Sequence, residues 1–331
     1  MCHYKHLSIK ERESLLLLIN ANKKITEIAK ILGRNASTIS RELKRNSSKK
    51  GYSAVDADEK YLKRRLNSKR HRLFDNEELR QKVLELFLEK QWSPEQISQR
   101  LKFENSQFQV SYNTIYRAIY DNSLKKPDTP RQRGLTLKLR HKGKTRHKGN
   151  AEENRGKFPV SHPLSERPKE ADDRQAIGHF EADTVLGKIG SVCLVTVVDR
   201  ASRFLFAKKV TKSTALQVNE AMIQLLKDFP KERLRSIVPD RGAEFKSHEK
   251  VSKALNNVQF YFPPPHSPWL RGTNENTNGL IREYLPKKSE IGLFSDEQID
   301  DFVFRLNTRP RKCLGWKSPF EVFFNSLLHL T

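Results

Sequence analysis

Three β-rich runs that begin just after Gly178 constrain the fold of this chain more than any other feature. They span residues 179–187, 192–200 and 203–210 and are separated by short turns, so three antiparallel strands are expected. A helix over 213–229, a strand over 235–238, a helix over 244–255, a strand over 258–262 and a further helix around Glu275 follow. The order β-β-β-α-β-α-β-α predicts a mixed sheet flanked by helices, and hence an α/β domain over residues 178–331.

Three acidic residues lie on separate elements of this predicted domain. Asp183 sits within a strand otherwise suited to burial, where an unpaired carboxylate would be costly. Asp240 directly follows the fourth strand, and Glu275 lies near the start of a helix that carries Asn278 and Arg282 on the same face. Three carboxylates on separate elements are what two Mg²⁺ ions, about 3.5 to 4 Å apart, require for in-line phosphoryl transfer. Taken singly, each acid is better explained by a surface or turn role.

A fourth acid, Asp199, ends the second predicted strand. The pair Ala201-Ser202 follows it and favours a turn. We therefore interpret Asp199 as a residue that caps this turn.

Residues 28–46 carry the pattern of a helix-turn-helix unit. Apolar residues at helical spacing are interrupted at Gly33, which supplies the positive φ of a tight turn, and resume with Ile39 and Leu43 on a second helix. With those two side chains turned inward, the outer face holds residue types that contact phosphates or base edges in a major groove. These residues are Ser37, Thr38, Arg41, Lys44 and Arg45. We predict a DNA-binding domain over 1–50; the alternative is a helical hairpin with a solvated basic face.

A weaker unit of the same plan spans residues 92–122, within a helical region over 51–122. Ser93 and Pro94 begin one helix, and a second helix turns Ile115 inward while Asn113 and Arg117 face outward. The connection between the two helices is longer than a standard tight turn. Purely structural helices are therefore as good an interpretation as a second DNA reader.

The charge of the chain lies mostly in its first half. The formal net charge is +24, and residues 1–150 hold 35 Lys and Arg against 16 Asp and Glu. Residues 123–150 carry ten of these cations with one acid and little apolar pattern, and we interpret 123–177 as a basic linker. A solvated tether and a phosphate-neutralising segment both fit it, and the overall excess of cations predicts a polyanionic partner.

Several classes of protein are excluded by simpler features. The longest apolar run, 15–19, is far short of the roughly 20 residues that cross a bilayer, and the first residues do not resemble a signal peptide. The three cysteines, Cys2, Cys193 and Cys313, lie far apart, which argues against a disulfide framework or a zinc ribbon. We therefore expect a cytoplasmic protein with no membrane association.

Three motifs in this order resemble a known family. The segment 265–282, PHSPWLRGTNENTNGLIR, is similar to the signature around the catalytic glutamate in bacterial transposases of the insertion sequence 30 family. The segment 178–184, GHFEADT, resembles the first aspartate motif of that family, and 240–245, DRGAEF, resembles the second. Residues 4–46, 92–120 and 306–323 share the likeness, so it covers nearly the whole chain. The chain departs from the common pattern at Phe180, where Trp is usual, and at Arg241, where Asn is frequent.

This resemblance implies a DDE transposase with a ribonuclease-H-like core, which makes the chain an α+β multidomain protein. Asp183, Asp240 and Glu275 would hold two Mg²⁺, or Mn²⁺, and catalyse DNA cleavage and strand transfer. The expected partners are double-stranded DNA, as terminal inverted repeats and target, and a second copy of the chain in a nucleoid-associated complex. Supporting residues that position DNA or brace the ligands would be His266, Trp269, Arg271, Asn274, Asn278 and Arg282. A DNA-binding regulator and a nuclease that cuts without joining are the rivals.

Overall fold

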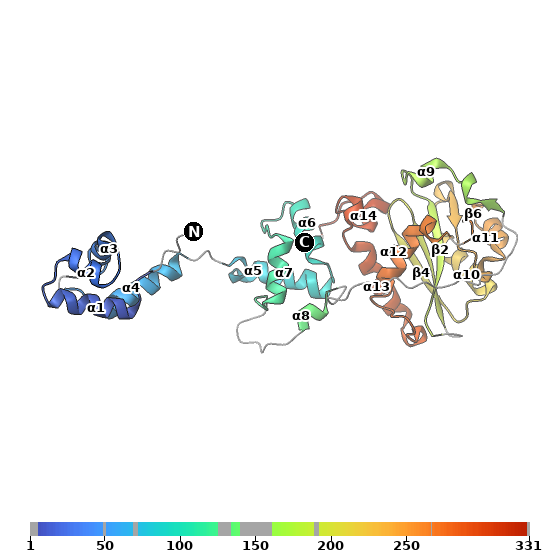
Figure 1. The fold of residues 1–331 in the computed structure, drawn as a ribbon. Helices are drawn as coiled ribbons and strands as arrows, with labels where there is room; N and C mark the ends of the chain where they lie inside the picture. The colour runs from blue at the N-terminus through green and yellow to red at the C-terminus, as the bar shows by residue number, and fades with distance from the viewer. Residues whose placement is uncertain are drawn as a thin grey trace. The chain divides into compact units, whose positions relative to one another are not determined.

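Helices alone build the first part of the chain. The computed structural model describes residues 6–48, 51–68, 72–124, 134–139, 161–188, 192–265 and 267–329. It forms two compact units, Met1–Asp75 and Asn76–Thr331. The first unit contains α1 (Ile9–Asn20), α2 (Ile25–Ile31), α3 (Ala36–Asn46) and α4 (Ala54–Asn67), followed by the 3-10 turn η1 (Leu73–Asp75) (Figure 1).

The core of the first unit explains why α4 belongs to it. Leu15, Ile28 and Ile39 are buried together where α1, α2 and α3 meet. Arg12 on α1 is also buried, and its guanidinium pairs with Glu42 on α3 at 2.8 Å and with Asp58 on α4 at 2.7 Å. We expected the first domain to cover 1–50, whereas the unit in the structure continues to Asp75 because α4 packs on α1 and supplies a partner for this buried cation.

The second unit begins with a further group of short helices. These are α5 (Glu77–Leu84), the π-helix η2 (Glu85–Glu89), α6 (Pro94–Phe103), α7 (Tyr112–Tyr120) and α8 (Gly134–Leu137). Helix α5 continues directly into the π-helix η2. The group contacts the C-terminal part of the chain, since Gln96 Nε2 donates to the Pro310 carbonyl at 2.8 Å and Arg100 pairs with Glu321.

A six-stranded mixed sheet forms the rest of the second unit. Its order is β1-β6-β5-β2-β3-β4, with the β2–β3 and β3–β4 pairs antiparallel and the β1–β6, β6–β5 and β5–β2 pairs parallel. The strands are β1 (His162–Pro163), β2 (His179–Leu186), β3 (Cys193–Asp199), β4 (Leu205–Val210), β5 (Ser236–Val238) and β6 (Gln259–Phe262). Five of them match the predicted strands to within about two residues, and only β1 was not expected.

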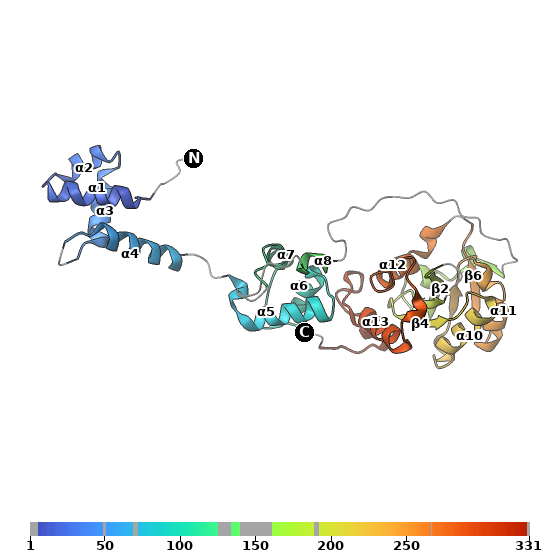
Figure 2. The ribbon, with the colours of Figure 1, turned by 90° about the horizontal axis from the view of Figure 1, so that it is seen from below.

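Helices cover both faces of this sheet. The α-helices of this part are α9 (Lys169–Asp172), α10 (Ala215–Leu226), α11 (His248–Ala254), α12 (Gly272–Ile281), α13 (Asp296–Thr308) and α14 (Pro319–Phe324). Its 3-10 turns are η3 (Leu164–Glu166), η4 (Lys231–Arg233), η5 (Ala243–Phe245), η6 (Pro268–Arg271), η7 (Ile291–Leu293) and η8 (Lys312–Leu314). Figure 2 shows α10 and α11 on one side of the strands and α12 and α13 on the other. β3 is buried along its whole length, as its apolar sequence requires for a strand covered on both faces.

The described part of the chain contains no helix with both the length and the apolar character that a bilayer crossing requires.

Candidate active site and DNA-binding helices

Strand β2 divides its side chains between the two faces of the sheet. Phe180 and Ala182 pack into the core beneath α10 and α11, while Val185 packs into the opposite core with residues of α12 and α13. Because the side chains of a strand alternate, Glu181 and Asp183 belong to the face that α12 covers. The acidic residue inside the strand is therefore directed toward the helix that carries Glu275.

Asp183 lies on β2, and Asp240 lies two residues beyond the end of the neighbouring strand β5. β2 runs parallel to β5, and Glu181 is level with Val238 in the register. Asp183 lies two residues after Glu181, and Asp240 lies two residues after Val238. The Asp183 carboxylate accepts from the Thr184 amide at 2.9 Å and from Asn278 Nδ2 at 2.9 Å. The strand pairing thus places two of the predicted acids side by side.

A cation lies between the two aspartates. Arg271 Nη1 is 3.9 Å from Asp183 Oδ2, and Arg271 Nη2 is 3.9 Å from Asp240 Oδ2. All three side chains are largely shielded, with exposed fractions of 11% for the arginine and 19% and 7% for the two acids. Opposite charges attract more strongly away from water, so the guanidinium offsets the repulsion between the paired carboxylates.

Glu275 lies near the start of α12. At helical spacing from it are Arg271, at the N-terminal boundary of the helix, and Asn278. Arg271 contacts both aspartates, and Asn278 donates to Asp183. Arg282, at the C-terminal boundary, donates through Nη2 to the Leu186 carbonyl at 2.8 Å. The Glu275 side chain is exposed. In the described ranges, no three His, Cys, Asp or Glu side chains are close enough together to hold a metal ion. The structure therefore brings two of the three acids together and holds the third on the helix beside them.

The donor set around the aspartates suits a hard cation. Carboxylate and amide oxygens are the ligands that Mg²⁺ takes in proteins. Asn278 Oδ1 is buried and has no hydrogen-bond partner within the described part of the chain, although its amide nitrogen donates to Asp183. An oxygen acceptor left over beside a carboxylate is what an incoming cation or its bound water would engage.

Glu244 is a further acid, close to Asp240, that the sequence patterns did not identify. Thr184 Oγ1 donates to Glu244 Oε1 at 2.8 Å, so the glutamate reaches the residue next to Asp183. The Gly242 amide donates to Asp240 Oδ1 at 2.8 Å, and a Cβ added at this glycine would lie 2.3 Å from Glu244 and 2.8 Å from Asp240. The spacing of the segment DRGAEF, two residues from the aspartate to the glycine and two more to the glutamate, is the signal that could have identified it.

The remaining supporting residues occupy varied places. Arg241, the cation that directly follows Asp240, donates through Nε to the Pro263 carbonyl at 2.7 Å. Trp269 is 70% exposed, whereas Asn274 is buried at the start of α12. His266 lies outside the described residues. Phe180 keeps an aromatic anchor where Trp is usual, since its ring packs edge-on against Phe229 at 5.4 Å.

Asp199 has the turn-capping role predicted for it. Its carboxylate accepts from the Gly178 amide at 2.8 Å, the Ser202 amide at 2.7 Å and the Ser202 hydroxyl at 2.6 Å. Burial raises the pKa of this carboxyl, and the hydrogen bonds from Ser202 and Gly178 act in the opposite direction. The residue therefore holds the β3–β4 turn and stands apart from the paired aspartates.

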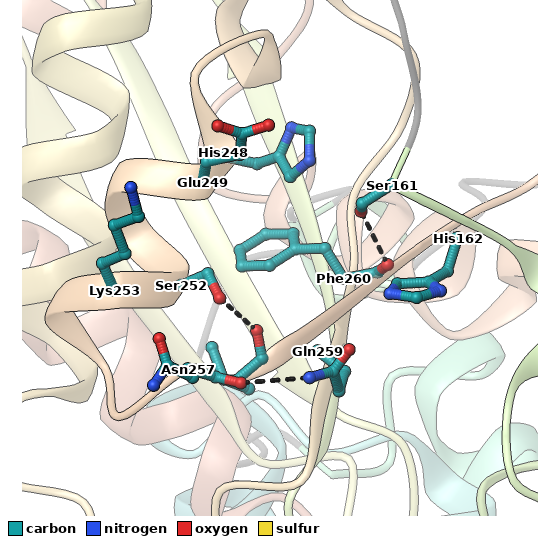
Figure 3. A pocket seen from close by; sticks show the side chains of 10 residues that line it. Ser161, His162, His248, Glu249, Ser252, Lys253, Asn257, Gln259 and Phe260 are labelled. Carbon is teal, nitrogen blue, oxygen red and sulfur yellow. Dashed lines mark hydrogen bonds between the residues drawn. The ribbon is translucent and has the colours of Figure 1, made fainter.

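A small hollow lies at the other end of the sheet, between α11 and the outer strands. Its volume is about 180 Å³ (Figure 3). Ser161 Oγ donates to the Phe260 carbonyl at 3.2 Å, and Ser252 Oγ donates to the Val258 carbonyl at 2.8 Å. Burial lowers the pKa of His248, which lines the same hollow. None of the predicted site residues lines it.

The first helix-turn-helix unit has the predicted geometry. Ile39 is buried and Leu43 is half-buried against the core, while Gly33 adopts a φ of +60° in the turn. Asn35 caps α3 by accepting from the Ser37 amide at 2.9 Å, and Arg41 Nη2 donates to Ser37 Oγ at 3.2 Å. Of the five predicted contact residues, Thr38 is half-buried and the others, Ser37, Arg41, Lys44 and Arg45, are exposed.

The second helix-turn-helix-like pair, α6 and α7, also turns its polar residues outward. Ile115 and Ile119 are fully buried on α7, whereas Asn113 and Arg117 are exposed and Tyr120 is 64% exposed. The helix pair α6 and α7 therefore presents a polar and aromatic face of the expected kind. Much of the basic linker, 125–133 and 140–160, lies outside the described residues.

Comparison with known proteins supports both halves of this description. A helix-turn-helix domain family matches residues 3–46, and an integrase core domain family matches residues 173–268. The transposase for insertion sequence element IS30A of Escherichia coli (strain K12) is 37% identical over 96% of this chain and 83% of its own length. This chain belongs to the insertion sequence 30 family of transposases. Another relative, the transposase for insertion sequence element IS1086 of Cupriavidus metallidurans, is 33% identical over 99% of this chain and 97% of its own length.

The family assignment fixes the fold class and the general kind of chemistry. The chain combines an N-terminal helix-turn-helix domain with an integrase core of ribonuclease-H-like fold. It is an α+β protein, as expected. The transposase from Bacteroides fragilis for IS4351, 32% identical over 96% of this chain and 95% of its own, has the same span. Polynucleotidyl transfer with DNA as partner is the activity class of these transposases and integrase cores, and integrase cores generally use divalent metal ions.

Proposed function

We propose that this chain binds the terminal inverted repeats of an insertion sequence, cuts the DNA with a water nucleophile and joins the freed 3′-OH to a target. The observation that carries the proposal is that Arg271 contacts both Asp183 on β2 and Asp240 just beyond β5, while Glu275 lies on α12, whose Asn278 donates to Asp183. A metal-dependent phosphoryl transfer needs acids from separate elements at one place, and Glu275 is proposed to join the two aspartates there.

Asp183, Asp240 and Glu275 are the residues proposed to hold Mg²⁺, or Mn²⁺, with two ions per site. When bound, such ions supply activation of the attacking oxygen and neutralisation of charge at the leaving oxygen. Asn278 fixes the Asp183 carboxylate by its hydrogen bond of 2.9 Å. Arg271 contacts both aspartates, which an ion bound there would also contact. Its guanidinium is therefore suited to leave the aspartates when an ion binds and to pair with a DNA phosphate.

The helix-turn-helix unit is proposed to read the element ends. Arg41, Lys44 and Arg45 are exposed on α3, and a guanidinium there can donate two hydrogen bonds to a guanine edge in the major groove. Asn113 and Arg117 on α7 offer a second contact surface, and the basic linker adds affinity through phosphates.

Joining two element ends requires two sites that act together. Each chain carries one such pair of aspartates, so we propose that at least two copies assemble on the DNA in the active complex. Ion-pairing with DNA by the many cations of residues 1–150 would place the complex with the nucleoid.

A strand-transfer assay tests this proposal directly. Full-length protein is incubated with a labelled duplex that carries candidate element ends, with and without Mg²⁺, and a denaturing gel separates cleaved from joined products. Wild-type protein should give both products only with Mg²⁺, while Asp183→Asn and Asp240→Asn should give neither and still bind the ends. Cleavage without joining would favour the nuclease, and binding by wild-type protein without cleavage would favour the regulator.

A further inference from the structure

Glu181 occupies an unusual place next to the aspartate motif. It lies two residues before Asp183 on the same face of β2, and its side chain is completely buried. Its Oε2 accepts from the Asn274 amide at 2.9 Å. Asn274 is the third residue of α12, so its N–H is one of those that a helix leaves without an intrahelical partner.

The hydrogen bond makes Glu181 the cap of α12. The residue at the N-terminal boundary of this helix, Arg271, makes no capping hydrogen bond with its side chain. A carboxylate from the neighbouring strand takes that role, and its negative charge faces the positive end of the helix dipole. The start of α12 is therefore attached to β2 at a point adjacent to both Asp183 and Glu275.

Arg200 fixes the other half of the Glu181 carboxylate. Its Nη1 donates to Glu181 Oε1, its Nε donates to the Ala171 carbonyl at 2.9 Å, and its Nη2 lies 3.8 Å from Asp172. The arginine side chain is only 6% exposed. With each carboxylate oxygen held by a different partner, Glu181 has one conformation available, and the buried charges are compensated.

We propose that Glu181 and Arg200 are positioning residues that set the register of α12 against β2, and with it the placement of Glu275 and Asn278 relative to Asp183. The inference rests on the proposed function of the three acids. Partners that orient metal ligands commonly change metal affinity or activity by roughly 10- to 100-fold when they are removed. A displacement of α12 by about 1 Å can have an effect of that size.

The test variant is Glu181→Gln. A glutamine oxygen can accept from either the Asn274 amide or Arg200, and its NH₂ group cannot accept from the other, so one of the two contacts is lost. The matched control is Asp199→Asn, which alters an equally buried carboxylate on the neighbouring strand β3. Asp199 bonds only to Gly178 and Ser202 among the hydrogen bonds found for its carboxylate, and neither lies on α12.

Two readouts separate positioning from plain stability. The first is the Mg²⁺ concentration for half-maximal cleavage at saturating DNA, and the second is Mg²⁺ binding without DNA, measured by calorimetry. We expect Glu181→Gln to need roughly 10-fold or more Mg²⁺ in both measurements, with the Kd for DNA within about twofold of wild type. Asp199→Asn should lower the melting temperature without raising the Mg²⁺ requirement.

The outcomes distinguish this inference from the function on which it rests. If Glu181→Gln needs no more Mg²⁺ than wild type, or if both variants shift alike, the positioning role is refuted while the three-acid site stands. If wild-type protein shows no Mg²⁺ response, the proposed function itself fails. Should Glu181→Gln not fold, Arg200→Lys keeps the buried cation but loses the planar fork, and the same rise in Mg²⁺ requirement is expected.

Discussion

Replacing Glu321 by Gln should destabilise the second unit by breaking a buried ion pair. Glu321 and Arg100 both have side chains with no exposed surface, and they meet in a two-pronged contact of 2.6 and 2.8 Å. Arg100 also donates to the Trp316 carbonyl at 2.9 Å and to the Leu328 carbonyl at 2.6 Å. The pair therefore joins α6 to the C-terminal segment, and the glutamine would leave a buried guanidinium with less compensation.

The size of the effect follows from the pKa of Glu321. Burial acts to raise it, but the hydrogen bonds from Arg100 and from the Ser318 and Leu328 amides outweigh burial and lower it from 4.5 to about 2. A shift of this size corresponds to about 3 kcal/mol of folding free energy, at the lower end of the range for breaking a buried pair. Because the folded pKa is depressed, this stability is present above about pH 4.5 and is lost as the pH falls toward 2.

Urea unfolding followed by tryptophan fluorescence measures this difference. All three tryptophans, Trp92, Trp269 and Trp316, lie in the second unit, so the signal does not report on the first. The control is Glu95→Gln, which breaks the exposed pair with Lys312 and should leave the free energy of unfolding nearly unchanged. A loss below 1 kcal/mol for Glu321→Gln at pH 7, or a difference from wild type that stays constant down to pH 2.5, would refute the reasoning.

Three further predictions concern DNA binding, and gel-shift or fluorescence titrations check all of them. Arg41→Ala should cost roughly 1 to 3 kcal/mol on cognate ends and much less on random DNA; an equal loss on both would make it a phosphate contact. Arg117→Ala should weaken cognate binding selectively if α7 reads bases, and an unchanged Kd would leave α6 and α7 as structural helices. Neutralising four linker cations should weaken cognate and random DNA alike and flatten the salt dependence by roughly 0.9 in slope per lost contact, while an unchanged slope would mark a solvated spacer. That variant carries Gln at Arg140, Lys142, Lys144 and Lys148.

The sheet was predictable because its strands are dense in apolar and β-branched residues. β3, with the sequence CLVTVVD, is buried at every position, and such a run has few alternatives to a central strand. β1 is only two residues long and exists because His162 and Pro163 pair with the outer edge of β6. No local pattern in the sequence encodes a pairing of this kind, since the partner lies about 100 residues away.

Helix α4 lies within the helical region predicted over 51–122, but its bounds and its packing on α1 were not predicted. Its large apolar residues Val55, Leu62 and Leu66 are exposed, whereas the small residues Ala54 and Ala57 are buried. A search for large apolar side chains at helical spacing therefore finds no buried stripe. The helix is held by its contacts with α1, including the ion pair between Arg12 and Asp58.

The site was predicted in part. Asp183 lies inside β2 and Asp240 follows β5, the strand that pairs in parallel with β2, so both positions follow from predicted strands. The expected helix over 244–255 begins later, because 243–245 form the 3-10 turn η5 and α11 starts at His248. That irregular start directs Glu244 to Thr184, a long-range contact that helical periodicity does not encode.

The central claim is that Glu275 completes the site with Asp183 and Asp240, although Glu244 is the acid that contacts Thr184, the residue after Asp183. Single-turnover cleavage of a labelled element end, at saturating DNA and Mg²⁺, compares Glu275→Gln with Glu244→Gln. We expect cleavage to be abolished in Glu275→Gln and to persist at a reduced rate in Glu244→Gln, with both variants binding DNA as wild type does. Wild-type cleavage by Glu275→Gln, with loss of cleavage in Glu244→Gln, would contradict the assignment and make Glu244 the third acid.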